Sequence, residues 1–82
     1  MAVFTDLEVK VLSNLKDVLV ETESVYLADL IQHDDNAKKM RGAISSLIKK
    51  NAIDVDYDYP SNINGTVHYP VTYWDEDALK TI

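Results

Sequence analysis

The stretch that decides the fold runs from residue 27 to residue 55: LADLIQHDDNAKKMRGAISSLIKKNAIDV. A short apolar segment is broken by a polar His-Asp-Asp triplet, after which apolar residues return at spacings of three and four. The second series is Met40, Ile44, Leu47 and Ile48, with Ala37 and Ala43 at its margins. This spacing predicts a helix over about residues 36–50, after a shorter one over about residues 25–32. The short connection between them predicts a helix-turn-helix.

Capping residues mark the ends of these two helices. Ser24 is expected to cap the shorter helix, although Val25 or Tyr26 can instead belong to a very short strand. Asp34 or Asp35 is expected to cap the longer helix by accepting its free N–H groups. Asn51 follows the last periodic residue, and asparagine often takes the left-handed conformation that ends a helix. The longer helix is therefore expected to stop at Lys50.

The chain before this stretch predicts another helix. Thr5-Asp6-Leu7-Glu8 has the form of a capping box, and Phe4 is placed as the staple residue before the cap. An apolar stripe follows, made of Leu7, Val11, Leu12, Leu15, Val18 and Leu19, and it is expected to leave Glu8, Lys10, Asn14 and Asp17 in solvent. A first helix is expected over about residues 6–20.

The chain after this stretch predicts a hairpin over about residues 53–74. Apolar Ile53, Val55 and Tyr57 alternate with Asp54, Asp56 and Asp58, which is the period of a half-buried strand. A second strand is expected from roughly Thr66 to Trp74, after an Asn64-Gly65 turn. Pro70 cannot donate a ladder hydrogen bond, so this strand is expected to lie at an edge or to be interrupted. The terminal DEDALKTI either adds one helical turn or frays.

Length and composition set limits on the function. The 82 residues make one domain, 1–82, and the apolar content of 46% is typical of a chain that folds. Cysteine is absent, which excludes thiolate metal sites and favours a reducing compartment, so we expect a cytoplasmic protein. No signal-peptide pattern or membrane-spanning run is present, so no membrane association is expected.

The order helix, short helix, helix, strand, strand resembles the winged helix-turn-helix superfamily, in particular MarR-like and related small bacterial, archaeal or phage regulators. The residues that carry the resemblance are Leu27-Ala28-x-Leu30, Leu47-Ile48-Lys49-Lys50, Asn51 and Ile53, with Asn51 where that family usually has glycine. The resemblance implies an α+β fold of three helices followed by a two-stranded β-hairpin wing. It also implies duplex DNA binding, with the third helix in the major groove and the wing over the adjacent backbone.

The charge pattern agrees with that expectation in part. Five of the eight basic residues lie in the third helix: Lys38, Lys39, Arg41, Lys49 and Lys50. The expected DNA-binding residues are Lys38, Lys39, Arg41, Gly42, Ser45, Ser46 and Lys49 on the helix, with Asn62 and Asn64 on the wing. Lysines near the helix start are placed to touch phosphates, and Arg41 and Ser45 to reach base edges. Gly42 costs up to about 1 kcal/mol against alanine in a helix, so close contact with DNA or another helix would explain it.

Other interpretations stay open. A charged stripe is also typical of a solvated helix face, and the acidic wing would repel phosphates. The net charge of −6 and the aromatic C-terminal half favour an alternative, a winged helix used for protein contact, such as a phage-type factor acting on host machinery.

We expect no catalysis and no cofactor, since no nucleophile, phosphate loop or carboxylate pair is recognisable, and His33-Asp34-Asp35 is better explained as a hydrated turn than as a metal cluster. Weak binding by one module predicts a homodimer, joined through the first helix or the strand around Trp74.

Overall fold

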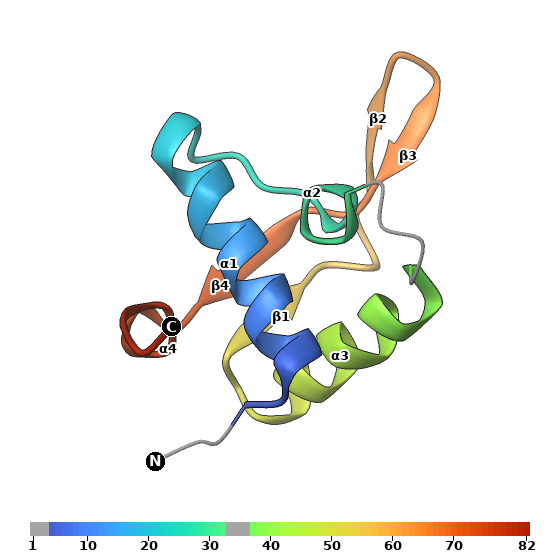
Figure 1. Cartoon of the computed structure of the whole chain (residues 1–82). Coiled ribbons are helices and arrows are strands. Elements are labelled where there is room, and N and C mark those ends of the chain that lie inside the picture. Colours follow the sequence, from blue (N-terminus) through green and yellow to red (C-terminus); the bar gives the residue numbers. More distant parts are fainter. Residues whose placement is uncertain (1–3, 33–36) are drawn as a thin grey trace.

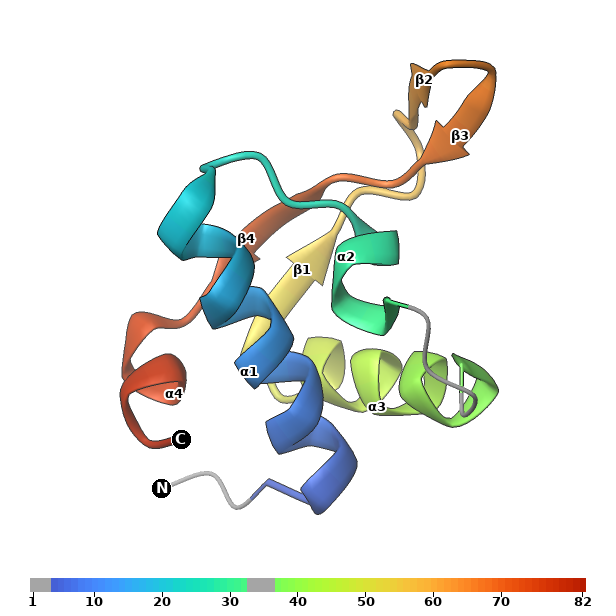
Figure 2. The same ribbon diagram turned by 45° about the horizontal axis from the view of Figure 1, so that its top comes forward.

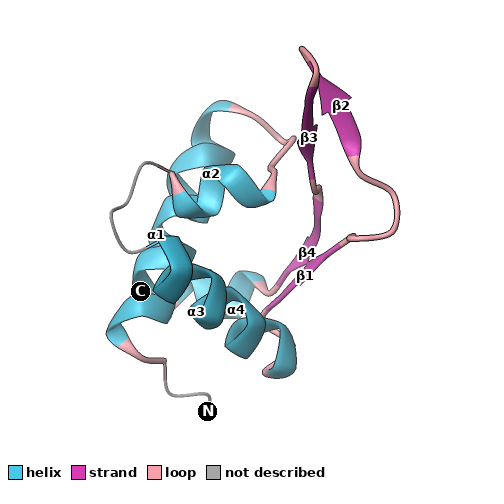
Figure 3. Ribbon diagram, turned by 90° about the vertical axis from the view of Figure 1, so that its right-hand side faces the viewer, coloured by secondary structure: helices cyan, strands magenta, loops and turns pink. Residues whose placement is uncertain are grey.

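The computed structural model describes residues 4–32 and 37–82 of the chain. Its helices are α1 (Asp6–Glu21), α2 (Leu27–Ile31), α3 (Ala37–Lys49) and α4 (Glu76–Lys80), and its strands are β1 (Ile53–Val55), β2 (Ser61–Ile63), β3 (Thr66–His68) and β4 (Val71–Trp74) (Figure 1). The helices gather on one side of the strands (Figure 3). The α+β class, with helices followed by an antiparallel hairpin, is confirmed.

α1 begins where the capping box predicts. Thr5 Oγ1 accepts a hydrogen bond from the Glu8 amide at 3.2 Å, and Glu8 Oε1 accepts one from the Thr5 amide at 2.8 Å. The predicted apolar stripe faces the core, where Val11, Leu12 and Leu15 are completely buried. The helix continues to Glu21, one residue beyond the expected end.

The segment before α2 is extended, so α2 begins at Leu27 and not at residue 25. The Leu27 amide donates to the Tyr69 carbonyl at 2.8 Å, and the Val71 amide donates to the Val25 carbonyl at 2.8 Å. These two bonds join the segment to the chain between β3 and β4. Of the two alternatives left open by the sequence, the very short strand is therefore the one that the structure contains.

The cap of α2 differs from the prediction for the same reason. Ser24 lies before the extended segment, too early to cap a helix that begins at residue 27, so the predicted Ser24 cap is wrong. Asp29 instead reaches back, and its Oδ2 accepts a hydrogen bond from the Tyr26 amide at 2.9 Å. The expected turn and helix cap at residues 33–35 lie outside the described residues.

α3 ends in a Schellman motif around Asn51. This asparagine has a φ of 61°, the left-handed conformation predicted for it. The Ala52 amide donates to the Leu47 carbonyl at 2.9 Å, and the Asn51 amide donates to the Ile48 carbonyl at 3.0 Å. Two carbonyls of the last turn are thereby satisfied, and the regular helix stops at Lys49, one residue before the predicted end.

The expected wing is divided into two separate antiparallel ladders, β1 with β4 and β2 with β3. Pro70 interrupts the second strand, as predicted, because it has no N–H to donate. On the opposite side, Asp56 Oδ1 accepts hydrogen bonds from the amides of Asp58 at 3.0 Å and Tyr59 at 3.2 Å. These bonds turn the chain into a local loop, so the first strand ends at Val55 and does not reach Tyr57.

The expectation of three helices is wrong, because the chain also forms α4. Asp75 Oδ1 accepts a hydrogen bond from the Asp77 amide at 3.0 Å and caps the helix. Ala78 and Leu79 are buried in the core cluster, and α4 packs against α1. The terminal segment therefore forms the additional helical turn that was one of the two expectations for it.

An ion pair between buried Glu8 and partly exposed Lys50 ties the start of α1 to the end of α3. Glu8 is only 1% exposed, and its Oε1 accepts a hydrogen bond from Lys50 Nζ at 2.8 Å. The same ammonium lies 5.6 Å from the centroid of the Phe4 ring, within the range of a cation–π interaction. Removing one partner of a buried pair leaves the other charge uncompensated, so this contact constrains how α1 and α3 pack.

The surroundings of Glu8 favour its charged form. Burial by itself raises the pKa of Glu8, but interactions with Lys50, Thr5 and Ser46 outweigh burial and lower this pKa from 4.5 to about 2. Glu8 Oε2 is buried and has no hydrogen-bond partner among the described residues. Because the folded pKa lies below the unfolded one, the stabilisation is present above about pH 4.5 and is lost as the pH falls towards 2.

Acid titration of stability tests this pair. We expect the protonation of Glu8 to lower the free energy of unfolding by roughly 2–3 kcal/mol between about pH 5 and pH 2. Glu8→Gln removes the titrating group at nearly constant size and flattens this part of the profile, whereas Asp17→Asn, on the exposed side of α1, leaves it in place. Urea denaturation followed by circular dichroism at each pH measures the effect. A Glu8→Gln profile as steep as that of the wild type contradicts the assignment.

Candidate nucleic-acid interface

α3 separates an apolar face from a polar one. Its buried residues are Met40, Ala43, Ile44 and Leu47. Its exposed residues are Lys38, Lys39, Arg41, Gly42, Ser45 and Lys49. The helical period predicted this separation, and the exposure of these six candidate residues is confirmed. α3 contains four cations and no acidic residue, so its solvent face is locally positive in a chain with a net charge of −6.

Ser46 and Lys50 are directed towards Glu8. Ser46 is half-buried at the margin of the exposed face and its hydroxyl helps to lower the pKa of Glu8, while its expected contact with DNA stays a prediction. Lys50 Nζ is bonded to Glu8 Oε1 and helps to fix the end of α3. Of the five basic residues of this segment, Lys38, Lys39, Arg41 and Lys49 remain as candidates for contact with a ligand.

Asp54, the first acidic residue after α3, lies near the C-terminal end of this helix. Asp54 lines a shallow depression together with Ile48 and Asn51. Lys38 is eleven residues before Lys49, which corresponds to about 16 Å along a helix at 1.5 Å per residue. This distance is roughly twice the Debye length of about 8 Å at physiological salt. The carboxylate of Asp54 therefore weakens the positive field mainly at the end of α3 and much less at its start.

The β2–β3 hairpin carries the other two candidate residues. Ile63 pairs with Thr66, so Asn64 and Gly65 form a two-residue turn, with φ values of 52° and 80°. Positive φ at both positions is the requirement of a type I′ turn, which confirms the predicted Asn-Gly turn. Asn62 and Asn64 are both exposed. Their amide groups are thus available at the tip of the hairpin.

The base of the hairpin is held by aromatic contact. His68 is half-buried, and its ring centroid lies 5.8 Å from that of Tyr26, just before α2. His68 pairs with Ser61, whereas Asn62 pairs with Val67, and neighbouring pairs of a ladder face opposite sides. Asn62 therefore faces away from the side that meets Tyr26. The N-terminal end of α3 and the hairpin extend towards the same side of the molecule (Figure 1, Figure 2).

Gly42 has no packing role within the described chain. It is exposed, and a Cβ built at this position would meet nothing within 4 Å. Packing against another helix among the described residues therefore does not explain the glycine. Nothing in the described part of the chain offsets the weak helix propensity of glycine at this position.

The remaining findings concern metal sites, membrane spans and known proteins. Residues 4–32 and 37–82 contain no group of three or more His, Cys, Asp or Glu side chains that is able to hold a metal ion. Within the same residues, no helix has the length and apolar character needed to cross a bilayer. Comparison with protein-family models, with curated proteins and with solved structures found no match to this chain.

Two features of the site were missed by sequence reasoning. The Glu8–Lys50 pair joins residues 42 positions apart. The prediction that Glu8 faces solvent is wrong, because Glu8 lies at helical spacing from Val11 and Leu12 and is only 1% exposed. The aromatic residues after β1 also pair, with the Tyr57 and Tyr69 ring centroids 5.4 Å apart. No local pattern connects residues at these separations.

Replacement of Gly42 by alanine measures how much the glycine lowers the free energy of unfolding. We expect Gly42→Ala to raise the free energy of unfolding by about 0.5–1 kcal/mol, since the new methyl group enters open space and alanine is the better helix former. Ser45→Ala, on the same exposed face, serves as the matched control and has a smaller effect. Urea denaturation measures both. A destabilised Gly42→Ala variant would mean that α3 packs differently from this structure.

Proposed function

We propose that this chain is a small winged helix-turn-helix protein that binds duplex DNA and acts by binding, as a transcriptional regulator, without catalysis. In this proposal α3 enters the major groove and the β2–β3 hairpin lies over the adjacent backbone. One observation carries it: the exposed face of α3 has four cations and no carboxylate, while its other face is fixed in the core.

The exposed residues of α3 divide into two roles. Lys38 and Lys39, in its first turn, contact phosphates, where a flexible ammonium needs no fixed geometry. Arg41 and Ser45 lie on the same exposed face and reach base edges in a major groove about 12 Å wide, which admits a helix. The guanidinium of Arg41 suits the two acceptors of guanine.

Two uncharged features support close approach to the duplex. Gly42 leaves open space beside the α3 backbone, so a base or phosphate can approach without a side chain between them. Asn62 and Asn64 place amide donors at the hairpin tip, where they reach phosphate and sugar oxygens. Because amides carry no charge, the hairpin adds little to the salt dependence of binding.

The salt dependence of DNA affinity tests the proposal. We expect the logarithm of the affinity for a fluorescent random-sequence duplex to fall linearly with the logarithm of the salt concentration. Lys38→Ala should reduce the magnitude of this slope by about 0.9, the value for one phosphate contact. Lys10→Ala removes the same charge from α1 and should leave the slope unchanged. Anisotropy titrations measure both, and either no binding at low salt or a slope indifferent to Lys38 contradicts the proposal.

The proposal includes a homodimer. Three lysines on α3 supply few phosphate contacts, and a single module of this kind binds weakly at physiological salt. Two modules that recognise paired half-sites about 34 Å apart add their contacts and overcome this weakness.

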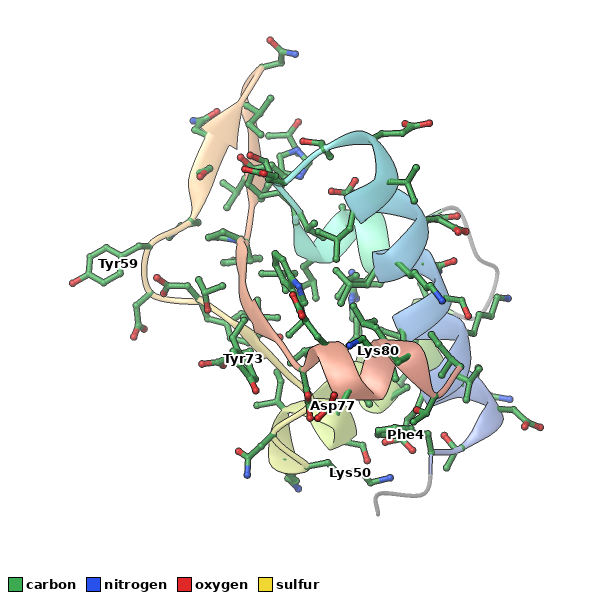
Figure 4. The ribbon with its side chains drawn as sticks, turned by 90° about the vertical axis from the view of Figure 1, so that its left-hand side faces the viewer. Phe4, Lys50, Tyr59, Tyr73, Asp77 and Lys80 are labelled. Carbon is green, nitrogen blue, oxygen red and sulfur yellow. The ribbon has the colours of Figure 1, made fainter. Side chains whose placement is uncertain are left out.

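The outer side of the strands favours a second function, contact with a basic protein partner. Tyr57, Tyr59 and Tyr73 are 50%, 79% and 49% exposed, far more than tyrosines of a core. Tyr59 and Tyr73 point away from the helices (Figure 4). Asp54 and Asp58 are exposed among them. Tyrosine rings and carboxylates together are suited to arginine. Its guanidinium stacks on aromatic faces and donates two parallel hydrogen bonds to a carboxylate.

A peptide of alternating arginine and glycine tests this second function. We expect calorimetry to show binding that weakens about fivefold for each of Asp54→Asn and Asp58→Asn, since each removes a charge-assisted hydrogen bond. The control pair Glu21→Gln and Glu23→Gln removes two exposed carboxylates beyond the strands. Equal weakening by both pairs would show diffuse charge attraction and would exclude a defined surface.

A further inference from the structure

A shallow groove lies between the C-terminal half of α1, the end of β4, and α4. Its walls are the apolar residues Leu19, Val20, Trp74 and Leu79, and its rim carries Lys16, Glu76 and Lys80. Figure 4 looks onto this side of the molecule, with Lys80 on α4. In Figure 1, α4 lies on the left, whereas the start of α3 and the hairpin extend to the right.

Val20 is the most unusual residue of this groove. Its side chain is 82% exposed, the highest value among the large apolar side chains of the described residues. It stands next to half-buried Leu19 in the last turn of α1, close to Trp74. The apolar surface of α1 thus continues beyond the part that α4 covers. Exposed apolar surface that is rimmed by polar groups is typical of an interaction site.

Charge identifies the occupant of the groove. The exposed charged side chains of α3 are all cationic, and the exposed charged side chains on the outer side of the strands are the carboxylates of Asp54 and Asp58. Two copies of either surface repel each other. The groove rim carries both signs, in Lys16, Glu76 and Lys80, and a two-fold axis can set opposite charges against each other. Of these three surfaces, the groove alone is complementary to itself.

We propose that a second copy of this chain covers the groove in an isologous dimer, with Val20 of each protomer packed against the apolar wall of its partner. A dimer of standard size buries roughly 800 Å² per partner, about one-seventh of the 5608 Å² surface of this chain. The interface therefore extends from the groove over the exposed sides of α4 and the last turns of α1. This inference does not rest on DNA binding, because its evidence is the groove and its charges.

Sedimentation equilibrium without DNA tests the interface. We expect the wild type to reach twice the chain mass of 9.3 kDa as its concentration rises. Val20→Glu should raise the dissociation constant at least about 30-fold, since each protomer then sets a carboxylate against the apolar wall of its partner, where removing the charge from water costs free energy. The exposed position of Val20 leaves the core intact, which circular dichroism verifies. Val67→Glu is the matched control: it charges another exposed valine, 54% accessible and on the hairpin, and should leave the dimer unchanged.

A wild type that stays monomeric at about 1 mM overturns this interface, as does a dimer that tolerates Val20→Glu or is dissociated by Val67→Glu. Anisotropy titrations on the same samples separate the result from the DNA proposal. A dimer without salt-dependent DNA binding leaves the interface standing and removes the DNA proposal. A monomer that binds DNA with the Lys38-dependent slope leaves DNA binding standing and removes both this interface and the homodimer that the DNA proposal includes.

Discussion

The buried contact between Glu8 and Lys50 constrains the rest of the structure. One carboxylate oxygen closes the capping box of α1 and binds the ammonium that follows α3, so the start of one helix and the end of another share an atom. The Schellman motif at Asn51 begins immediately after Lys50 and directs the chain into β1. The apolar face of α3 sets the direction of Arg41 and Ser45, and the Glu8–Lys50 contact holds the end of the helix against the start of α1.

The sequence predicted what is decided within a few residues. Thr5 and Glu8 are three positions apart, Asn51 ends its helix through bonds to the preceding turn, and Pro70 interrupts a strand by its own lack of an N–H. The bridge of Val25 and Leu27 to the chain around Pro70 was left undecided, because its partners are more than 40 positions away. Backbone pairing at that distance overrode the local Ser24 signal for a helix start.

In the candidate site, too, the sequence predicts the features that depend on local spacing and misses those that depend on distant contacts. A period of 3.6 residues suffices to expose Lys38, Arg41 and Lys49, since a helix with one apolar face must turn the other to solvent. It does not reveal that Ser46, at the margin of the two faces, is directed to a carboxylate on α1. The open space beside Gly42 also depends on where the other elements lie, and only the packed chain shows that none of them fills it.

The segregation of charge explains how an acidic chain can present a cationic helix. With a net charge of −6, the molecule as a whole is repelled by phosphate, and at low salt this repulsion opposes encounter. At physiological salt the Debye length of about 8 Å is short against the molecular extents of 39 × 25 × 23 Å, so a duplex close to α3 senses mainly the local cations. Approach from the outer side of the strands is unfavourable, because Asp54 and Asp58 then face the phosphates. In the proposed complex, these acidic residues would restrict the orientation of the encounter, and the basic helix would supply the contact.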